Sequence, residues 1–195
     1  MLHNIKVVFK TLMFVFVLSF TTFVFWGYKQ QQIMAEEKEI TRPDFERENN
    51  ITFLRSVNQC VEYIYNVTSD VYPVNKEILL AQAALESGWG NSRFSLEGKN
   101  LFGMRTYDLR EPHMLPSNNP KKWGVKVYQH ECDSVLHYIQ TLNNHSAYED
   151  YRKGLENNID TLKLVETLGA YASDKNYFPK VKSIIRKIRE DYNIN

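Results

Sequence analysis

The sequence predicts a predominantly helical α+β protein, with a small loop-rich β-lobe and an N-terminal transmembrane helix. Three observations carry this prediction. An apolar run stands near the N-terminus, apolar residues recur at helical spacing over most of the remaining chain, and glycines and prolines interrupt that spacing between residues 98 and 130. The composition agrees, because 195 residues with 43% hydrophobic and 24% charged side chains are typical of a globular domain with an appendage.

The apolar run has the length of a membrane span. No charged residue occurs from Thr11 to Tyr28, and a helix of that length covers about 27 Å, close to the roughly 30 Å of a hydrocarbon core. Lys6 and Lys10 precede the run and glutamates follow it, so the positive-inside rule places the short N-terminus in the cytoplasm. We therefore predict residues 1–28 to be a signal anchor, single-pass in the inner membrane, with the domain in the periplasm.

A cleaved signal peptide, which would give a secreted protein, is the alternative. The run ends in Phe25-Trp26-Gly27-Tyr28, where bulky rings stand in place of the small residues that a signal peptidase requires. This ending favours the anchor.

The two cysteines, Cys60 and Cys132, fall on the exported side, where a disulfide is chemically allowed. Both also fit helical apolar faces as buried thiols. We favour the buried thiols, although the sequence leaves both states open.

The segment after the anchor, residues 29–48, mixes Gln, Glu, Lys and Arg around Pro43 without apolar periodicity. Such a pattern is typical of a solvated tether. The domain is accordingly predicted over residues 49–195. Its first helix is indicated by apolar residues at helical spacing, and Pro73 ends that segment; those residues are Phe53, Val57, Cys60, Val61 and Ile64.

The second helix has clear limits. Asn75 is a suitable N-cap, residues 76–86 are good helix formers, and Gly88 is a stop signal. Between residues 98 and 130, only Gly124 to Gln129 alternates like a strand. Helical periodicity then returns in three groups: Cys132, Val135, Leu136 and Ile139; Leu162, Val165 and Leu168; and Val181, Ile184, Ile185, Ile188 and Tyr192.

Several functions are excluded by composition and motif. The 24 basic and 23 acidic residues nearly balance, so no positive field exists to hold nucleic acid. Neither a Ser-x-x-Lys nor a Gly-x-Ser-x-Gly nucleophile motif occurs, and phosphate-binding glycine loops are missing. The five histidines form no His-Glu-x-x-His pattern. We predict neither a metal nor another cofactor.

Glu86 is the strongest catalytic candidate. It lies in the last turn of the second helix, where backbone carbonyls disfavour a carboxylate, and Leu79, Ala83 and Trp89 would add desolvation. Both effects raise the pKa. A carboxylic acid that stays protonated near neutral pH is what a glycosidase needs to protonate a leaving sugar oxygen.

Aromatic residues around this helix could form apolar platforms for sugar faces, or they could belong to the core. They are Trp89, Phe94, Phe102, Tyr107, Trp123 and Tyr128.

The stretch from Leu80 to Phe94, followed by Gly98 to Gly103, resembles the signature of the bacterial endo-β-N-acetylglucosaminidase family. That family includes flagellar and autolysin peptidoglycan hydrolases, and the sequence is most similar to its Bax-like subgroup. Weaker likeness continues to about residue 190 and includes Tyr171-Ala172-Ser173-Asp174. The resemblance covers roughly residues 50–190.

The resemblance implies a lysozyme-like fold and cleavage of β-1,4 bonds on the N-acetylglucosamine side in peptidoglycan glycan strands. Glu86 falls on the catalytic acid of the family, and Tyr171 and Tyr177 fall on tyrosines near the cleaved sugar. The substrate-binding residues that we expect are Ser87, Trp89, Phe102, Tyr171 and Tyr177.

A second catalytic group is less clearly marked. Glu111, in the predicted β-lobe, is our candidate for the second carboxylate that an inverting or a retaining enzyme needs. It could instead be a loop carboxylate paired with Arg110 or left in water. The 2-acetamido oxygen of the substrate could also attack, which requires no second carboxylate.

The functional hypothesis is therefore a membrane-tethered endo-β-N-acetylglucosaminidase in which Glu86 is the general acid. A lytic transglycosylase, which shares the fold and a similar Glu-Ser pair, is one alternative. A wall-binding module without catalysis is another.

Overall fold

The computed structural model describes residues 19, 21–29, 40–117, 122–169, 171, 174 and 176–192. The chain divides into two compact units, Met1–Ile40 and Thr41–Asn195. In the first unit, residues 21–29 are helical. Among the residues so described, none of the helices combines the length and the apolar character that a membrane span needs. Most of the predicted anchor, residues 1–18 and 20, lies outside the described residues.

The second unit is mostly helical with one small sheet, which confirms the predicted α+β class and the loop-rich β-lobe. Its helices are α2 (Asn50–Val67), α3 (Lys76–Ser87), α4 (Arg93–Gly98), α5 (Glu131–Asn144), α6 (Glu149–Glu156), α7 (Thr161–Leu164) and α8 (Tyr177–Lys187). Short helical turns η1 (Ser146–Tyr148), η2 (Val165–Thr167) and the π-helical η3 (Ile188–Tyr192) join or extend them.

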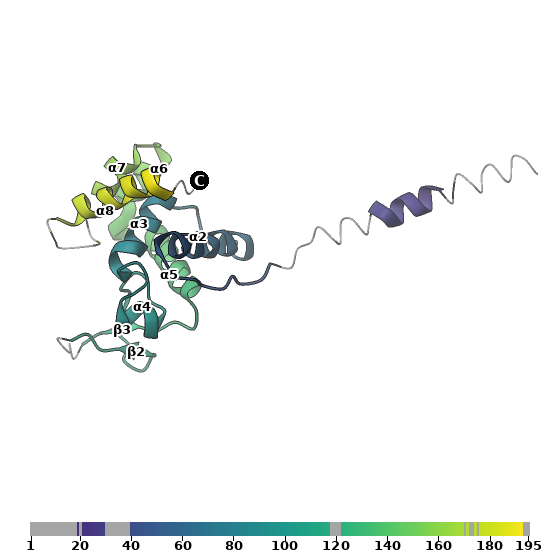
Figure 1. Ribbon diagram of the computed structural model, residues 1–195. Coiled ribbons are helices and arrows are strands. Elements are labelled where there is room, and N and C mark those ends of the chain that lie inside the picture. The colour runs from purple at the N-terminus through teal and green to yellow at the C-terminus, as the bar shows by residue number, and fades with distance from the viewer. Residues whose placement is uncertain are drawn as a thin grey trace, which may run out of the picture. The chain divides into compact units, whose positions relative to one another are not determined.

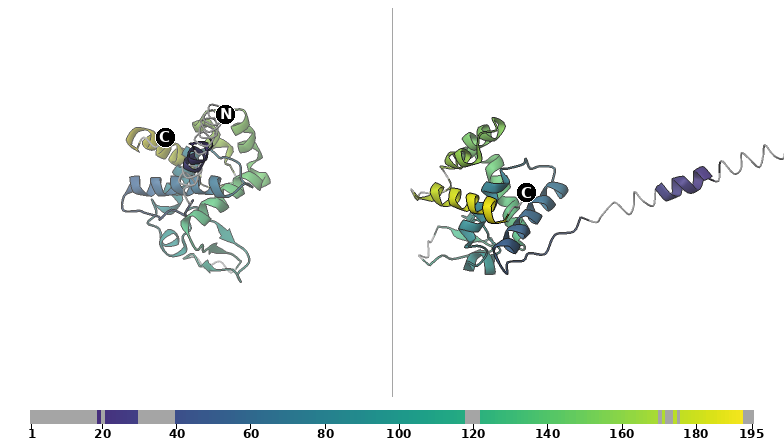
Figure 2. Two further views of the ribbon diagram at one scale, coloured as in Figure 1. Left: turned by 90° about the vertical axis from the view of Figure 1, so that its right-hand side faces the viewer. Right: turned by 45° about the horizontal axis from the view of Figure 1, so that its top comes forward.

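Figure 1 shows α4 and the strands at one end of this unit, and α6, α7 and α8 at the opposite end. The turned view at the left of Figure 2 keeps the same separation. Helix α3 packs against α8, and α2 packs against α5. One hydrophobic core draws side chains from all four of these helices, so the helix that carries Glu86 is fixed at its centre.

Helix α3 begins and ends where the sequence predicts. The Asn75 side chain accepts the Ile78 amide hydrogen at 3.0 Å and caps the first turn. Gly88 ends the helix in the left-handed conformation, with φ of 58°, which glycine adopts without the steric penalty of a side chain. Every residue from Ile78 to Ala84 is buried.

The small sheet has the strand order β1-β3-β2, and both pairs are antiparallel. The strands are β1 (Arg105–Thr106), β2 (His113–Met114) and β3 (Gly124–Lys126), the last within the predicted strand at 124–129. A Cβ on Gly124 would lie 2.5 Å from the His113 ring, so a larger residue at position 124 would separate β2 from β3.

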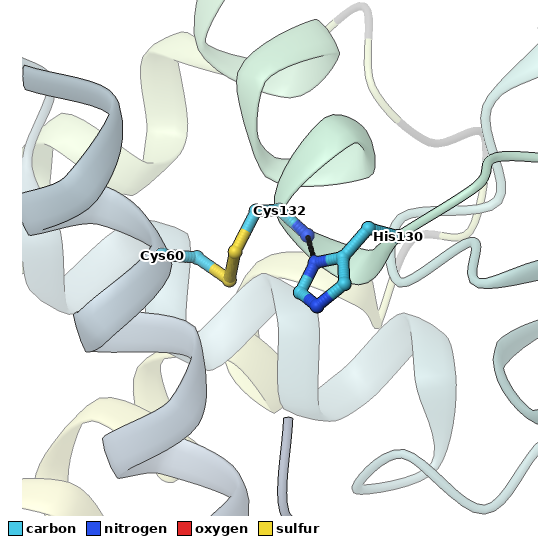
Figure 3. Close-up of side chains that lie close together, drawn as sticks. All are labelled: Cys60, His130 and Cys132. Atoms are coloured by element: carbon cyan, nitrogen blue, oxygen red, sulfur yellow. Dashed lines mark hydrogen bonds between the residues drawn. A yellow bond between two sulfur atoms is a disulfide. The ribbon is translucent and has the colours of Figure 1, made fainter. Parts of the chain in front are cut away.

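The cysteines form a disulfide, which corrects the prediction of two buried thiols. Cys60 on α2 is bonded to Cys132 on α5, with the two Cα atoms 4.9 Å apart. The packing of α2 on α5 brings them together across 72 residues of sequence, a proximity that helical periodicity alone does not reveal. Figure 3 shows His130 beside the disulfide, where its Nδ1 accepts the Cys132 amide hydrogen at 3.1 Å. Sulfur atoms joined in this way offer no thiolate to a metal.

The domain begins earlier than the predicted boundary at Asn49. Residues 41–48, which we call the N-terminal strap, lie against it. The Phe45 ring packs edge-on against Phe53, with centroids 5.9 Å apart, and the Glu46 amide donates to the Ser56 hydroxyl at 2.9 Å. Arg42 forms an ion pair of 3.2 Å with Asp133. These contacts come from individual side-chain and backbone groups of a segment without helix or strand, so they leave no helical period in the sequence.

We expect reduction of the Cys60–Cys132 disulfide to lower the free energy of unfolding by about 4 kcal/mol, because the unfolded chain regains the freedom of a long loop. Urea titration of the full chain, with and without reductant, measures this difference. The control is the Cys60→Ala/Cys132→Ala variant, whose unfolding midpoint should not respond to reductant. Equal midpoints for the oxidised and reduced wild-type chain would contradict the expectation.

Candidate active site

Glu86 is partly buried in the last turn of α3. Burial raises the pKa of its carboxyl group, and a hydrogen bond from Tyr177 opposes that rise without cancelling it. The direction agrees with the prediction from sequence. The sequence did not predict the hydrogen bond that opposes the rise, because Tyr177 lies 91 positions further along the chain.

Tyr177, the first residue of α8, is held by a buried chain of hydrogen bonds. Tyr138 donates to the Gln82 side-chain oxygen, and the Gln82 amide donates to the Tyr177 hydroxyl oxygen at 2.7 Å. The Tyr177 hydroxyl keeps its own hydrogen to donate, and Glu86 is a hydrogen-bonding partner of this hydroxyl. Sequence reasoning missed Gln82 and Tyr138. The signal available in the sequence was a glutamine in the otherwise apolar run from Ile78 to Leu85, on the same helix as the candidate acid.

Aromatic packing fixes Tyr171 and Tyr177 beside each other. Their rings stack with centroids 5.7 Å apart, and the Tyr171 hydroxyl donates to the Phe102 carbonyl at 3.0 Å. Burial raises the pKa of both tyrosines well above the ordinary value, so both hydroxyls stay protonated. The Phe102 ring is buried and stacks on Tyr138 at 4.1 Å, which places it under this cluster and not at a surface open to ligand.

Ser87 and Trp89 belong to the turn that ends α3. The Ser87 hydroxyl is fully buried, donates to the Ala83 carbonyl at 2.5 Å and accepts the Gly90 amide hydrogen at 2.7 Å. The Trp89 ring packs edge-on against Phe53 and Tyr192. The geometry thus ties both side chains to the shape of the turn, whereas we had predicted them among the substrate-binding residues.

Glu111 lies on the exposed loop between β1 and β2. Its carboxylate accepts from the Thr106 hydroxyl at 2.9 Å and pairs with the Lys126 ammonium at 3.2 Å, and these partners lower its pKa. Arg110, the partner that we considered from sequence, pairs instead with Asp108 at 2.6 Å.

Tyr128 lies beside His137, and the charge of Glu111 acts on it. Its hydroxyl lies 2.5 Å from His137 Nδ1, and burial raises its pKa with a further contribution from the Glu111 charge. Tyr128 and Glu86 both contribute to the raised pKa of Tyr171, after burial.

The two carboxyl groups have opposite pKa shifts. Burial favours the protonated form of Glu86, while Thr106 and Lys126 favour the ionised form of Glu111. Carboxyl groups whose pKa values are pushed apart can act as a proton donor and a proton acceptor. Enzymes that cleave glycosidic bonds with two carboxyl groups use one protonated and one ionised group.

Residues 63–190 match the glucosaminidase family, described as mannosyl-glycoprotein endo-β-N-acetylglucosaminidase. The chain belongs to this family. The match confirms the resemblance seen in the sequence from Leu80 to Phe94 and onward.

Individual relatives agree with this membership. The chain is 24% identical over 165 residues to exo-glucosaminidase LytG of Bacillus subtilis, covering 79% of this chain and 57% of that protein. It is 35% identical over 85 residues to protein Bax of Escherichia coli, covering 43% and 28%. It is 31% identical over 132 residues to peptidoglycan hydrolase FlgJ of Vibrio parahaemolyticus, covering 59% and 41%. The chain thus spans between 28% and 57% of the length of these relatives.

Solved structures share the fold. The catalytic domain of the autolysin Auto from Listeria monocytogenes matches with a TM-score of 0.54 and 25% identity, covering 83% of this chain and 94% of that one. The glycoside hydrolase domain of Salmonella typhimurium FlgJ, in a truncated form, matches with a TM-score of 0.52 and 22% identity, covering 72% and 98%.

In Tyr177→Phe we expect the pKa of Glu86 to rise, because the hydrogen bond that stabilises the carboxylate is removed. NMR titration of the full chain, labelled at glutamate side-chain carboxyl carbons, measures this pKa directly. Tyr72→Phe, at an exposed ring, is the matched control and should leave the titration of Glu86 unchanged. An unchanged or lower pKa in Tyr177→Phe would refute the hydrogen bond.

Proposed function

We propose that this chain is a peptidoglycan hydrolase that cleaves β-1,4 bonds on the N-acetylglucosamine side, with Glu86 as the general acid. The observation that carries the proposal is Glu86 itself, a partly buried carboxyl group whose pKa is raised by burial and which has Tyr177 as its hydrogen-bonding partner. Membership of the glucosaminidase family supports the same reaction. The mostly helical lobe and the small sheet fit a lysozyme-like arrangement.

In the proposed reaction, Glu86 gives its proton to the leaving glycosidic oxygen. The Tyr177 hydrogen bond holds the Glu86 carboxyl group in place and stabilises the carboxylate that forms. Tyr171 supports Tyr177 by stacking on it. Thr106 and Lys126 stabilise the ionised form of Glu111. Glu111 takes a proton from the water whose oxygen adds to the sugar. If the acetamido oxygen of the substrate attacks instead, Glu111 is dispensable.

The proposed substrate is the glycan strand of peptidoglycan. The relative named FlgJ is a peptidoglycan hydrolase, and the solved relative from Listeria is an autolysin. The family description names a mannosyl-glycoprotein glycan, so a high-mannose glycopeptide is the comparison substrate.

We propose that the domain works on the exported side of the membrane, in the periplasm, tethered by residues 1–28. The Cys60–Cys132 disulfide supports this location, because disulfides persist in oxidising compartments. The apolar run without charge from Thr11 to Tyr28 supports the tether.

We expect Glu86→Gln to lose at least about 100-fold in the rate of sugar release from purified sacculi, because an amide cannot donate the required proton. The full chain is assayed in mild detergent, and Glu97→Gln, an exposed position on α4, is the matched control with unchanged activity. Equal rates for Glu86→Gln and the wild-type chain would defeat the assignment of the acid.

Mass spectrometry of the same digests separates the alternatives. Reducing N-acetylglucosamine ends support the proposed hydrolysis, whereas anhydro-muramic ends identify a lytic transglycosylase. Saturable binding to sacculi that survives Glu86→Gln, with no product from the wild-type chain, identifies a wall-binding module.

The pH profile tests Glu111. In Lys126→Met we expect the acid limb of kcat/KM to move to higher pH, because loss of the lysine charge raises the pKa of the carboxyl group that must be ionised. The alkaline limb, which reports Glu86, should stay in place.

In Glu111→Gln the rate should fall by about 100-fold and the acid limb should disappear. Full activity of Glu111→Gln would exclude Glu111 and favour attack by the substrate.

A further inference from the structure

The turn that follows Glu86 has an unusual backbone. Gly88, Trp89 and Gly90 have φ angles of 58°, 59° and 81°, three left-handed residues in succession. For a tryptophan this conformation is energetically unfavourable, and such strain persists only where surrounding contacts enforce it. The shape of this turn sets where α3 ends, and it thereby affects the position of Glu86 in the last turn of the helix.

Hydrogen bonds inside the turn account for part of its restraint. The Trp89 amide donates to the Ala84 carbonyl at 2.8 Å, and the Ser92 amide donates to the Ser87 carbonyl at 2.8 Å. Gly90 also lies directly against Phe53, since an added Cβ would come within 2.7 Å of that ring. The Gly90 carbonyl needs a donor from elsewhere in the chain.

Arg47, in the N-terminal strap, supplies that donor. Its Nη1 donates to the Gly90 carbonyl at 3.2 Å and to the Ser95 carbonyl and hydroxyl at 3.4 Å. Its other terminal nitrogen pairs with the Glu131 carboxylate, and the guanidinium lies 5.1 Å from the centre of the Phe45 ring. Arg47 therefore joins the strap, the turn after α3, and the starts of α4 and α5.

The charge of Glu131 alone does not explain an arginine at position 47. The Glu131 side chain is only 4% exposed, but it has a second cation, the Lys99 ammonium at 3.3 Å. What Arg47 adds is a planar group with several fixed donors, which can hold a carboxylate and two carbonyls at once. A lysine offers a single charged nitrogen that cannot span these partners.

We propose that Arg47 is a positioning residue for the Glu86 general acid, acting through its hydrogen bond to the Gly90 carbonyl. This inference rests on the proposed function. Arg47 lies outside residues 63–190, the part of the chain that matches the family. Misplacement of a catalytic group by about 1 Å can slow a reaction by about 100-fold.

The competing interpretation is that Arg47 only neutralises the buried Glu131 charge. Single substitution of Arg47 cannot separate the two, because it leaves a buried carboxylate short of a partner and destabilises the fold. The double variant Arg47→Met/Glu131→Gln removes both charges together. It should recover most of the melting temperature that Arg47→Met loses, while the Gly90 carbonyl still lacks its donor.

We expect kcat on sacculi to fall by about 10- to 100-fold in Arg47→Met/Glu131→Gln, with KM little changed, because binding is retained and the acid is misplaced. Glu131→Gln alone, which keeps Arg47, should retain most of the wild-type kcat. Arg47→Lys should not restore kcat. Arg42→Ala removes an exposed ion pair of the same strap and is the matched control, with wild-type kcat expected. Wild-type kcat in the double variant would overturn the proposal.

Amide hydrogen exchange provides a readout that does not depend on activity. In the double variant, protection of the Trp89 and Gly90 amides should fall, while protection in the middle of α2 and α5 stays at the wild-type level. If the wild-type chain releases no sugar, the proposed function fails, and the exchange result still decides whether Arg47 holds the turn. Unchanged protection of both amides would overturn the role of Arg47 whatever the activity.

Discussion

The carboxyl group of Glu86 depends on a balance between burial and one hydrogen bond. Burial in the last turn of α3 favours its protonated form, and the Tyr177 hydroxyl stabilises the ionised form. A proton donor needs both influences, because it must hold the proton before the bond breaks and carry negative charge afterwards. Much of the second unit serves this arrangement, since α3 lies at the centre of the core and α8 packs on it.

The buried amide of Gln82 is tolerated in the interior because both its oxygen and its nitrogen have partners. Gln82 is fully buried, yet its oxygen accepts from Tyr138 and its amide donates to Tyr177. A buried polar group without a partner is costly, so such a chain also fixes a single orientation for every member. In this molecule the chain runs from Tyr138 through Gln82 to Tyr177, the hydrogen-bonding partner of Glu86.

Three connections between distant parts of the sequence hold the surroundings of α3. The disulfide joins α2 to α5, the strap lies across Phe53 and Ser56, and Arg47 reaches from the strap to the Gly90 carbonyl. The strap was predicted to be a solvated tether, because its composition is polar and its apolar residues have no period. An extended segment can nevertheless attach through a few individual side chains, and patterns of hydrophobicity do not detect such contacts.

The sequence by itself determined the class of fold, the limits of α3 and the identity of the candidate acid. These depend on local chemistry: Asn75 caps the first turn, Gly88 ends the helix, and Glu86 stands among apolar neighbours. The tertiary structure decided which residues surround that acid. Tyr177 and Arg47 both contact the end of α3, although they are 130 positions apart in the sequence. The pairing of the cysteines follows from helix packing. Contacts of this kind arise only when the helices pack, since no spacing along the chain encodes them.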